Sequence, residues 1–232
     1  MNKIEVRGSS EDRNIVLEED TVIYYRDCDI KVNYTVLNEV TLFEYVENSN
    51  LDKNYDIRSN FVLNTFSVNS SLDVCLDLNC ENISVSYSYS TLNENNNNYE
   101  VNINHNFSNQ TSEIINHGIN LDSNNLSFIV NANVPKDSIN INTNQDSKIL
   151  LLGDGVASIL PNLVIDNDDI EASHSAYVGD FKKEELFYLE SRGLSNLDSK
   201  KLLAKSFLLG NMKNITFREI DLIKEKLNMY WR

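Results

Sequence analysis

The residue best placed to do chemistry is His174, within the stretch from Asp168 to Gly179. Imidazole binds metal ions and titrates near neutral pH, so a histidine at a seam between two parts of a protein can hold a metal or fix an interface. If this stretch is a strand, His174 shares a sheltered face with apolar neighbours at alternate positions, and Glu171 faces the other side. These neighbours are Ile170, Ala172, Ala176 and Val178. A packed structural histidine is the alternative interpretation, because many histidines are simply packed in protein interiors.

The other metal-ligating and nucleophilic side chains are scattered along the chain. Cys75 and Cys80 are five residues apart and would point to opposite faces of one strand, so they do not form a metal pair by themselves. Together with Cys28 they are expected to be structural, since unpaired cysteine behaves as a small hydrophobic residue. His105 is expected on an apolar strand face and His117 in a turn, where packing or capping is the ordinary role.

No catalytic motif accompanies these residues. The sequence contains no Gly-x-Ser-x-Gly, no phosphate loop, no dinucleotide fingerprint, no His-Glu-x-x-His and no Cys-x-x-Cys. The lone glycine pair at 153–155 predicts a turn. Neither a hydrolase, a nucleotide-binding enzyme nor a self-contained zinc or cluster site is therefore indicated.

The elements before about residue 179 have the pattern of short β-strands. Apolar and small polar residues alternate through 72–79, 83–89, 99–104 and 126–134. Clusters of Asn and Asp, such as 94–98, can supply turns in the left-handed region without glycine. A sandwich usually needs Asn-Gly or Asp-Gly hairpins, which are almost absent here, so a stacked β-solenoid is favoured although no regular sequence period is visible.

The last part of the chain has the pattern of three short amphipathic helices. They are expected over 181–191, over 196–209, and from a capping box of Thr216 and Glu219 through Tyr230. Such helices can cap one end of a solenoid or offer a groove to a partner.

Charge divides the chain at the same place. The 232 residues include 20 basic and 35 acidic side chains, a net charge of -15, which argues against a nucleic-acid backbone binder. Residues 180–232 carry 11 basic and 8 acidic residues, whereas residues 1–179 carry 9 and 27. We therefore expect a β-helix core over 1–179 and a helical subdomain over 180–232.

The cellular setting is predicted from absences in the sequence. There is no apolar run of about 18 residues to cross a membrane and no apolar stretch at the N-terminus typical of a secretory signal. Three cysteines without such a signal fit a reducing compartment, so a cytoplasmic location is expected, with neither membrane nor nucleic acid as a partner.

Several segments together form a more specific pattern. Residues 163–174 read L-V-I-D-N-D-D-I-E-A-S-H, residues 178–179 read V-G, and residues 186–194 read L-F-Y-L-E-S-R-G-L. Upstream, 145–152 read Q-D-S-K-I-L-L-L, and a looser pattern runs from His105 through Ser112 to Gly118 and Asp122. This combination resembles the SufB/SufD family of iron–sulfur cluster assembly proteins, most strongly over 145–193.

The resemblance implies a mainly β protein: a right-handed parallel β-helix core followed by a small C-terminal α-helical subdomain. It also implies a non-catalytic scaffold that binds a SufC-like ATPase through the helices and pairs through the β-helix with a SufB-like subunit or with itself as a homodimer. A transient iron or iron–sulfur cluster would be held at that interface, with His174 and Glu171 as candidate ligands. The candidate ATPase-docking residues are Phe187, Tyr188, Arg192, Leu202, Leu203 and Phe207.

Departures from the family pattern qualify this assignment. Ser175 stands where the motif usually has glycine, and Ala172 stands where SufD proteins often have cysteine. The scaffold cysteine of SufB-type proteins is missing from 145–152, so the chain is more SufD-like, in a short form without the N-terminal helical region. A structural interaction module without a cluster role is the alternative. A β-helix enzyme for acidic polysaccharides is disfavoured, because no Lys or Arg lies between Arg58 and Lys136 to clamp an anionic sugar.

Overall fold

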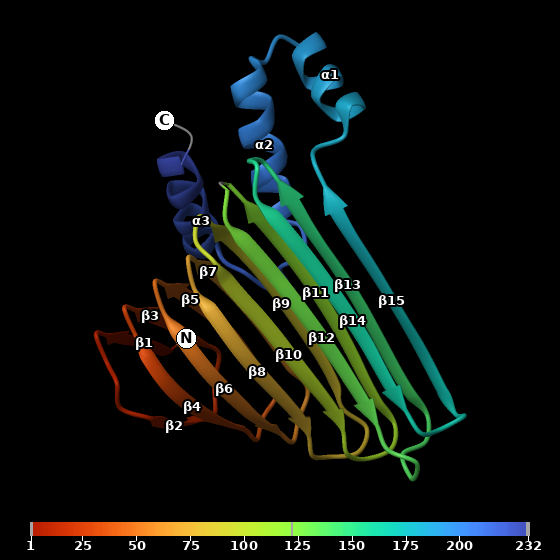
Figure 1. Cartoon of the computed structure of the whole chain (residues 1–232). Coiled ribbons are helices and arrows are strands. Elements are labelled where there is room, and N and C mark those ends of the chain that lie inside the picture. Colours follow the sequence, from red (N-terminus) through yellow and green to blue (C-terminus); the bar gives the residue numbers. More distant parts are fainter. Residues whose placement is uncertain (1, 122, 231–232) are drawn as a thin grey trace.

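Fifteen strands and then three helices make up the part of the chain that the structure, a computed structural model, describes: residues 2–121 and 123–230 (Figure 1). Asp122, the last residue of the looser family pattern, lies outside the described residues. The odd-numbered strands are β1 (Asn2–Arg7), β3 (Thr21–Arg26), β5 (Val40–Glu47), β7 (Phe61–Val68), β9 (Ser84–Asn93), β11 (Gln110–Asn120), β13 (Ile141–Leu151) and β15 (Ile170–Gly179). The even-numbered strands are β2 (Arg13–Leu17), β4 (Asp29–Val36), β6 (Asn50–Ile57), β8 (Ser71–Leu78), β10 (Asn97–His105), β12 (Asn125–Val134) and β14 (Val156–Ile165).

These strands build a parallel β-helix, as the sequence predicts. The odd strands form one sheet in chain order and the even strands form a second sheet, so each coil contributes one strand to each sheet. All paired neighbours are parallel, for example Glu44 opposite Thr65 and Thr65 opposite Tyr89. Because side chains alternate between faces, every second residue points between the sheets and stacks on its equivalent in the next coil.

The turns between consecutive strands explain why the chain needs so little glycine. Seven described Asn or Asp residues adopt positive φ, most of them at these turns, including Asn48, Asn69 and Asn109. Asn and Asp tolerate this region because their short side chains bond locally to the backbone. The general expectation of glycine-free turns is thus confirmed. Residues 94–96 also connect β9 to β10 without glycine, although no residue of 94–98 has positive φ. Residues 153–155 do form a turn, between β13 and β14.

The interior is apolar and aromatic, but it also encloses a charged pair that the strand pattern did not single out. The Lys53 ammonium lies 2.5 Å from Glu44 Oε2, and both side chains are fully buried. Tyr34 and Tyr55 donate hydrogen bonds to Glu44 Oε1 at 2.7 and 3.0 Å, and Thr65 donates to Oε2 at 2.8 Å. The buried carboxylate is therefore surrounded by four donors, which a buried charge requires.

The three helices are α1 (Lys183–Ser191), α2 (Asn196–Leu209) and α3 (Phe217–Tyr230), close to the predicted ranges. They do not cap an end of the stack. Instead, α2 and α3 cover the outer face of the odd-strand sheet and share a second hydrophobic core with it (Figure 1). Ala204 and Leu208 from α2 and Ile223 from α3 are fully buried there. Since both parts share one core, the division into domains 1–179 and 180–232 stays a prediction.

The predicted capping box at the start of α3 is present. The backbone N–H of Thr216 donates to Glu219 Oε2 at 2.7 Å, and Arg218 N–H donates to Thr216 Oγ1 at 3.3 Å. Within the described residues, no helix has the length and apolar character needed to span a membrane.

Candidate functional site

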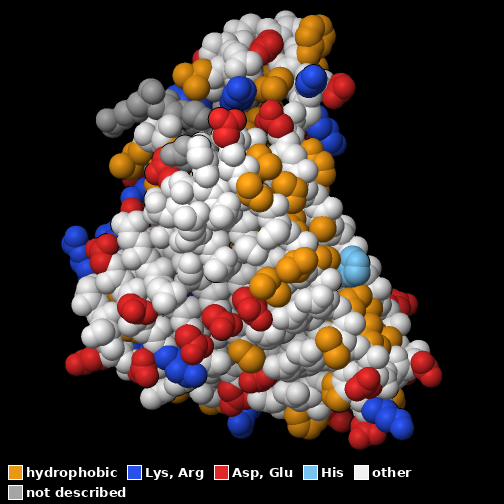
Figure 2. Space-filling model, viewed as in Figure 1, with side chains coloured by type: hydrophobic (Ala, Val, Ile, Leu, Met, Phe, Trp, Pro, Cys, Tyr) orange, Lys and Arg blue, Asp and Glu red, His pale blue; other side chains and the backbone are white. Residues whose placement is uncertain are grey.

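The β-helix is open at its C-terminal end. Strands β14 and β15 each have only one neighbour, so their outer backbone N–H and C=O groups are unpaired within the described chain. Their interior-facing residues have no following coil to cover them. The interior positions of β14 are Ala157, Ile159, Pro161, Leu163 and Ile165, all half-buried. This end is therefore a largely apolar surface with two free strand edges, and hydrophobic side chains gather around it (Figure 2).

The apolar character continues around the outside of β14. Val156, Leu160 and Val164 face outward and are 64%, 53% and 54% exposed. On the preceding even strands the outer positions are mostly Asn and Asp, as in Asn131 and Asn133. The last coil thus differs from the earlier ones in what it presents to solvent, and exposed apolar patches of this kind mark interaction sites.

His174 lies in the middle of β15 on this open end. It pairs in register with Gln145, whose side chain is fully buried, so the predicted interior direction of the ring is correct. The predicted shelter is wrong: His174 is exposed, because β15 is the last strand and nothing covers its interior face. Alternation alone gives the direction of a side chain but not whether another coil follows.

Glu171 does not join His174 in one site. It lies on the opposite face of β15, where its Oε2 accepts a hydrogen bond from Asn142 at 3.0 Å. Among the described residues no group of three or more His, Cys, Asp or Glu side chains could hold a metal ion. His174 alone could offer one ligand to a metal or cluster at this end, and the remaining ligands would have to come from elsewhere.

The cysteines lie far from His174 along the stack. Cys28, Cys75 and Cys80 all precede β9, so at least three coils separate them from β15. Cys28 is buried, and its thiol donates to the Arg26 carbonyl at 3.2 Å. Burial, together with the nearby Asp77 carboxylate, raises the pKa of Cys75 to about 11. The Cys75 thiol is therefore poorly suited to act as a nucleophile at neutral pH.

The other two histidines have structural partners. His105 points into the interior, where Nε2 lies 3.0 Å from Ser112 Oγ and burial lowers its pKa to about 4. His117 was expected in a turn, but it lies inside β11 with its ring stacked on Phe207 at 4.2 Å. Its Nδ1 lies 2.6 Å from the Phe207 carbonyl. The turn prediction failed because Gly118 serves packing instead: a Cβ there would come within 2.8 Å of the Leu126 and Phe128 side chains on β12, across the interior.

The six predicted docking residues separate into two groups. Phe187 and Tyr188 on α1 are 73% and 58% exposed, the Arg192 guanidinium lies 5.2 Å from the Tyr188 ring, and Leu202 is exposed on α2. No residue of α1 is buried. Leu203 and Phe207, in contrast, turn toward the sheet and line a cavity of about 490 Å³ between α2 and the end of β15. Only the first group forms an exposed surface.

A polar seam that sequence reasoning missed fixes the end of α2 to the sheet. Asn211 donates to the carbonyls of Tyr89 and Ile115 at 3.0 and 3.2 Å and accepts from Ser90 at 3.0 Å. Ser90 Oγ also donates to the Leu208 carbonyl at 2.8 Å. The carbonyl groups in the last turn of a helix need such partners. In the sequence, however, Ser90 looks like an ordinary outward-facing residue of a strand.

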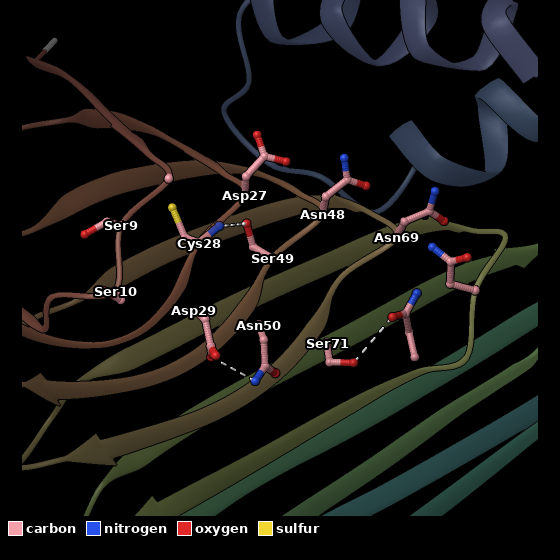
Figure 3. A pocket seen from close by; sticks show the side chains of 13 residues that line it. Ser9, Ser10, Asp27, Cys28, Asp29, Asn48, Ser49, Asn50, Asn69 and Ser71 are labelled. Carbon is pink, nitrogen blue, oxygen red and sulfur yellow. Dashed lines mark hydrogen bonds between the residues drawn. The ribbon is translucent and has the colours of Figure 1, made fainter.

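A polar hollow of about 650 Å³ follows the turns from odd to even strands in the first coils. Figure 3 shows its side chains in rows, because the same turn is repeated in each coil. The repeated turn residues are Asp27, Asn48 and Asn69. Cys28 N–H donates to Ser49 Oγ at 3.0 Å and Asn50 Nδ2 donates to Asp29 Oδ1 at 3.1 Å. These groups bond to one another, so the hollow is explained by turn architecture.

Taken together, fold and site define a parallel β-helix protein whose candidate sites are exposed surfaces: an open apolar end with one histidine, and a helix that stands away from the body. The family model described as SUF system FeS cluster assembly, SufBD core domain, matches residues 38–207. The chain therefore belongs to the SufBD family of iron–sulfur cluster assembly proteins.

Individual relatives match shorter regions. The iron-sulfur cluster assembly protein SufD of Bacillus subtilis is 32% identical over 96 residues, which is 41% of this chain and 22% of that protein. An iron-sulfur cluster assembly SufBD family protein of Pyrococcus horikoshii is 41% identical over 69 residues, 30% of this chain and 16% of the relative. SufD of Escherichia coli is 33% identical over 76 residues, 32% and 18% of the two chains. The matched regions thus span about a fifth of these relatives.

Proposed function

We propose that this chain is a SufD-like scaffold subunit of an iron–sulfur cluster assembly complex that works in the cytoplasm without catalysing a reaction of its own. Through its open end it pairs with a SufB-type subunit or a second copy, and through α1 and the start of α2 it binds a SufC-type ATPase. Iron or a nascent cluster, the cargo of assembly, is held near His174. Membership in the SufBD family supports the general role.

The open end is the observation that carries the proposal. Two free strand edges and the uncovered apolar positions of β14 and β15 leave both hydrogen-bonding groups and apolar area without partners. Edge strands of this kind readily pair with another chain. A partner bound here would also cover His174 and bury its ring.

The metal ligands at the open end favour binding of the cargo jointly with a partner subunit over binding by this chain alone. His174 is the only metal-ligating side chain on the interior face of β15, and no cysteine is near it. One imidazole is too few ligands for iron, which needs several in proteins. The partner subunit would therefore have to supply the thiolates, which fits a pair in which this chain is the SufD-like member.

The exposed surface of α1 supports the second contact. Phe187 and Tyr188 are large aromatic side chains held in solvent, and aromatic and Arg side chains are enriched where binding energy is concentrated. The remaining docking candidates, Leu203 and Phe207, support this surface from behind by packing α2 on the sheet.

A co-purification experiment tests the ATPase contact. When the chain is coexpressed with the SufC-type ATPase, we expect wild type to retain it and Phe187→Ala/Tyr188→Ala to lose most of it. The matched control is Met229→Ala, a 58% exposed apolar residue on α3 that should not matter. Equal retention by all three proteins, or by none, would count against α1 as the docking site.

Anaerobic reconstitution with iron and sulfide tests the cargo site. With a SufB-type partner present, we expect His174→Ala to lower visible absorbance from the bound cluster, whereas Ser173→Ala, on the opposite face of the same strand, should leave it unchanged. Unaltered loading of His174→Ala would favour the second candidate function, a purely structural interaction module. The absence of a multi-ligand group in the described chain is the observation that keeps that candidate in view.

A further inference from the structure

The buried carbonyl oxygen of the Gln145 side chain lacks a hydrogen-bond partner among the described residues. The side chain is fully buried, and its Nε2 makes only a long contact of 3.5 Å to the Asn162 carbonyl. Its Oε1 is also buried and accepts no hydrogen bond from any described residue. A buried carbonyl oxygen without a donor is costly, so it needs an explanation at this position.

The position of Gln145 is unusual within its own column. The interior residues in register below it are Leu42, Leu63, Tyr87 and Ile114. The residue above it is His174. Thr21 lies below Leu42, and from Leu42 upward the column is apolar or aromatic until the last closed coil, where an amide and then an imidazole appear. Ile114 directly below has no polar side chain to meet the free Oε1, whereas His174 directly above carries ring nitrogens that can donate.

Among the described residues, His174 is the only interior side chain of β14 or β15 that carries a hydrogen-bond donor. The other interior residues of β15, Ala172 and Ala176 among them, carry no polar side chain. In-register side chains on neighbouring parallel strands stack at the strand spacing of roughly 4.8 Å. His174 is now exposed and makes no hydrogen bond to a described residue, so rotation of its ring is unobstructed by a competing bond.

We propose that Gln145 is the positioning residue for His174: its Oε1 accepts a hydrogen bond from one ring N–H when a partner covers the open end. This inference rests on the proposed function of His174. The bond fixes one ring tautomer and leaves the other nitrogen unprotonated, facing outward toward the cargo. Histidines that bind metals are commonly held in this way by an acceptor behind the ring.

The tautomer of His174 provides a direct test that needs no iron. In the complex with a SufB-type subunit, ¹⁵N shifts of labelled histidine should report a single tautomer for wild type, with the resonances assigned by their loss in His174→Ala. Gln145→Met keeps the length of the side chain without the acceptor and should give a mixture. Gln145→Glu keeps an acceptor and should restore the single tautomer.

Ser147→Ala is the matched control. It removes a neighbouring interior polar group, one that accepts from Asn116 at 3.0 Å and lies below Ala176 instead of His174. It should leave the tautomer unchanged. Identical tautomer populations in wild type and Gln145→Met, with both proteins folded by circular dichroism, would overturn the proposal.

Iron(II) binding provides a second readout. Loss of an outer-shell partner typically lowers metal affinity 10- to 100-fold. We expect that loss for Gln145→Met in the complex, with affinity retained in Gln145→Glu and Ser147→Ala. If His174→Ala fails to lower iron affinity, the cargo role itself is wrong. If His174→Ala lowers it and Gln145→Met does not, only the positioning role fails.

Discussion

At the scale of single residues, the interior of this β-helix contains polar groups that strand periodicity does not reveal. Lys53 and Glu44 occupy positions where alternation predicts apolar side chains, yet both are fully buried. His105 likewise points inward and bonds to Ser112. Each group is tolerated because specific partners on neighbouring strands replace the lost hydrogen bonds to water. The contribution of each group to the free energy of unfolding therefore depends on its partner.

Removing one member of the buried ion pair should be far more damaging than removing a surface one. Lys53→Met leaves the Glu44 carboxylate buried without its countercharge, and we expect the free energy of unfolding to fall by about 3–5 kcal/mol. Lys31→Met breaks the exposed pair with Asp52, at 3.3 Å, and should cost less than about 1 kcal/mol. Urea titration of both variants checks this. Equal losses in the free energy of unfolding would mean that water reaches the interior ion pair.

His105 should make the fold weaker in mild acid. Its pKa is about 4 in the folded chain because burial disfavours the charged ring, compared with about 6.5 when unfolded. The unfolded chain therefore binds more protons between these values, so stability is present above pH 6.5 and is lost as pH falls. We expect a loss of about 2 kcal/mol between pH 7 and 5 from this residue.

Urea titrations of wild type and His105→Gln at pH 7 and 5 provide the measurement. The variant should lose less stability than wild type over this range. His117, whose pKa burial also lowers, contributes in the same direction in both proteins, so the difference isolates His105. If wild type and His105→Gln lost the same stability, the His105 ring would take up no proton on unfolding, because it would already be protonated in the folded chain at pH 5.

At the scale of elements, α2 is fixed to the sheet by an apolar face and by a polar seam at its C-terminal end. Its C-terminal turn and the following Asn211 bond to the outer face of β9 and β11, whereas no residue of α1 is buried. The docking surface is thus carried by a segment whose attachment combines the shared apolar core with this local polar seam. Small changes in this seam should loosen the helices without disturbing the β-helix.

Asn211→Ala should show this separation. It removes two donated bonds and one accepted bond and leaves the buried carbonyls of Tyr89 and Ile115 without that donor, so we expect a local loss of roughly 2–3 kcal/mol. Hydrogen exchange should speed up in α2 and α3 and stay slow in β5–β9. Asn196→Ala, which removes one exposed bond to Glu190, is the control and should change neither region. Uniformly faster exchange would instead indicate one cooperative unit.

At the scale of the whole molecule, the rod presents its apolar side chains at one end and its acidic and Asn side chains along one sheet. The net charge of -15 lies mainly on residues 1–179, while the helical segment is slightly basic. The open end carries few charges: Glu171 is the only acidic residue of β15, and β14 has none. Charge repulsion between partners is therefore weak at the free edges of β14 and β15, which favours pairing through that end.

A charge placed at the open end should prevent pairing. Val178→Glu introduces a carboxylate on the interior face of β15, where a partner would bury it. We expect the Kd of the complex with a SufB-type subunit, or of the homodimer, to rise at least 10-fold. Leu37→Glu makes a similar change at an exposed turn between β4 and β5 and should have no effect. Sedimentation analysis distinguishes the species, and unaltered pairing in Val178→Glu would place the interface elsewhere.

Sequence alone was sufficient for most of the local structure, with His117 in β11 as an exception. Alternation over 72–79 and 126–134 gave strands, Asn-rich turns replaced glycine, and the helix at 196–209 was predicted with its observed bounds, because these patterns depend on side chains only a few residues apart. The family segments around 163–194 further indicated the parallel β-helix. The inward direction of His174 followed from the same alternation.

Only the tertiary structure decided which elements cover one another. It left His174 exposed on the last strand, turned Leu203 and Phe207 toward the sheet, placed the helices along the rod instead of on its end, and set Gln145 directly below the imidazole. These outcomes depend on which coil is last and on contacts between residues tens to more than a hundred positions apart. Local periodicity specifies a side chain's direction, but burial is set by whatever packs against that direction.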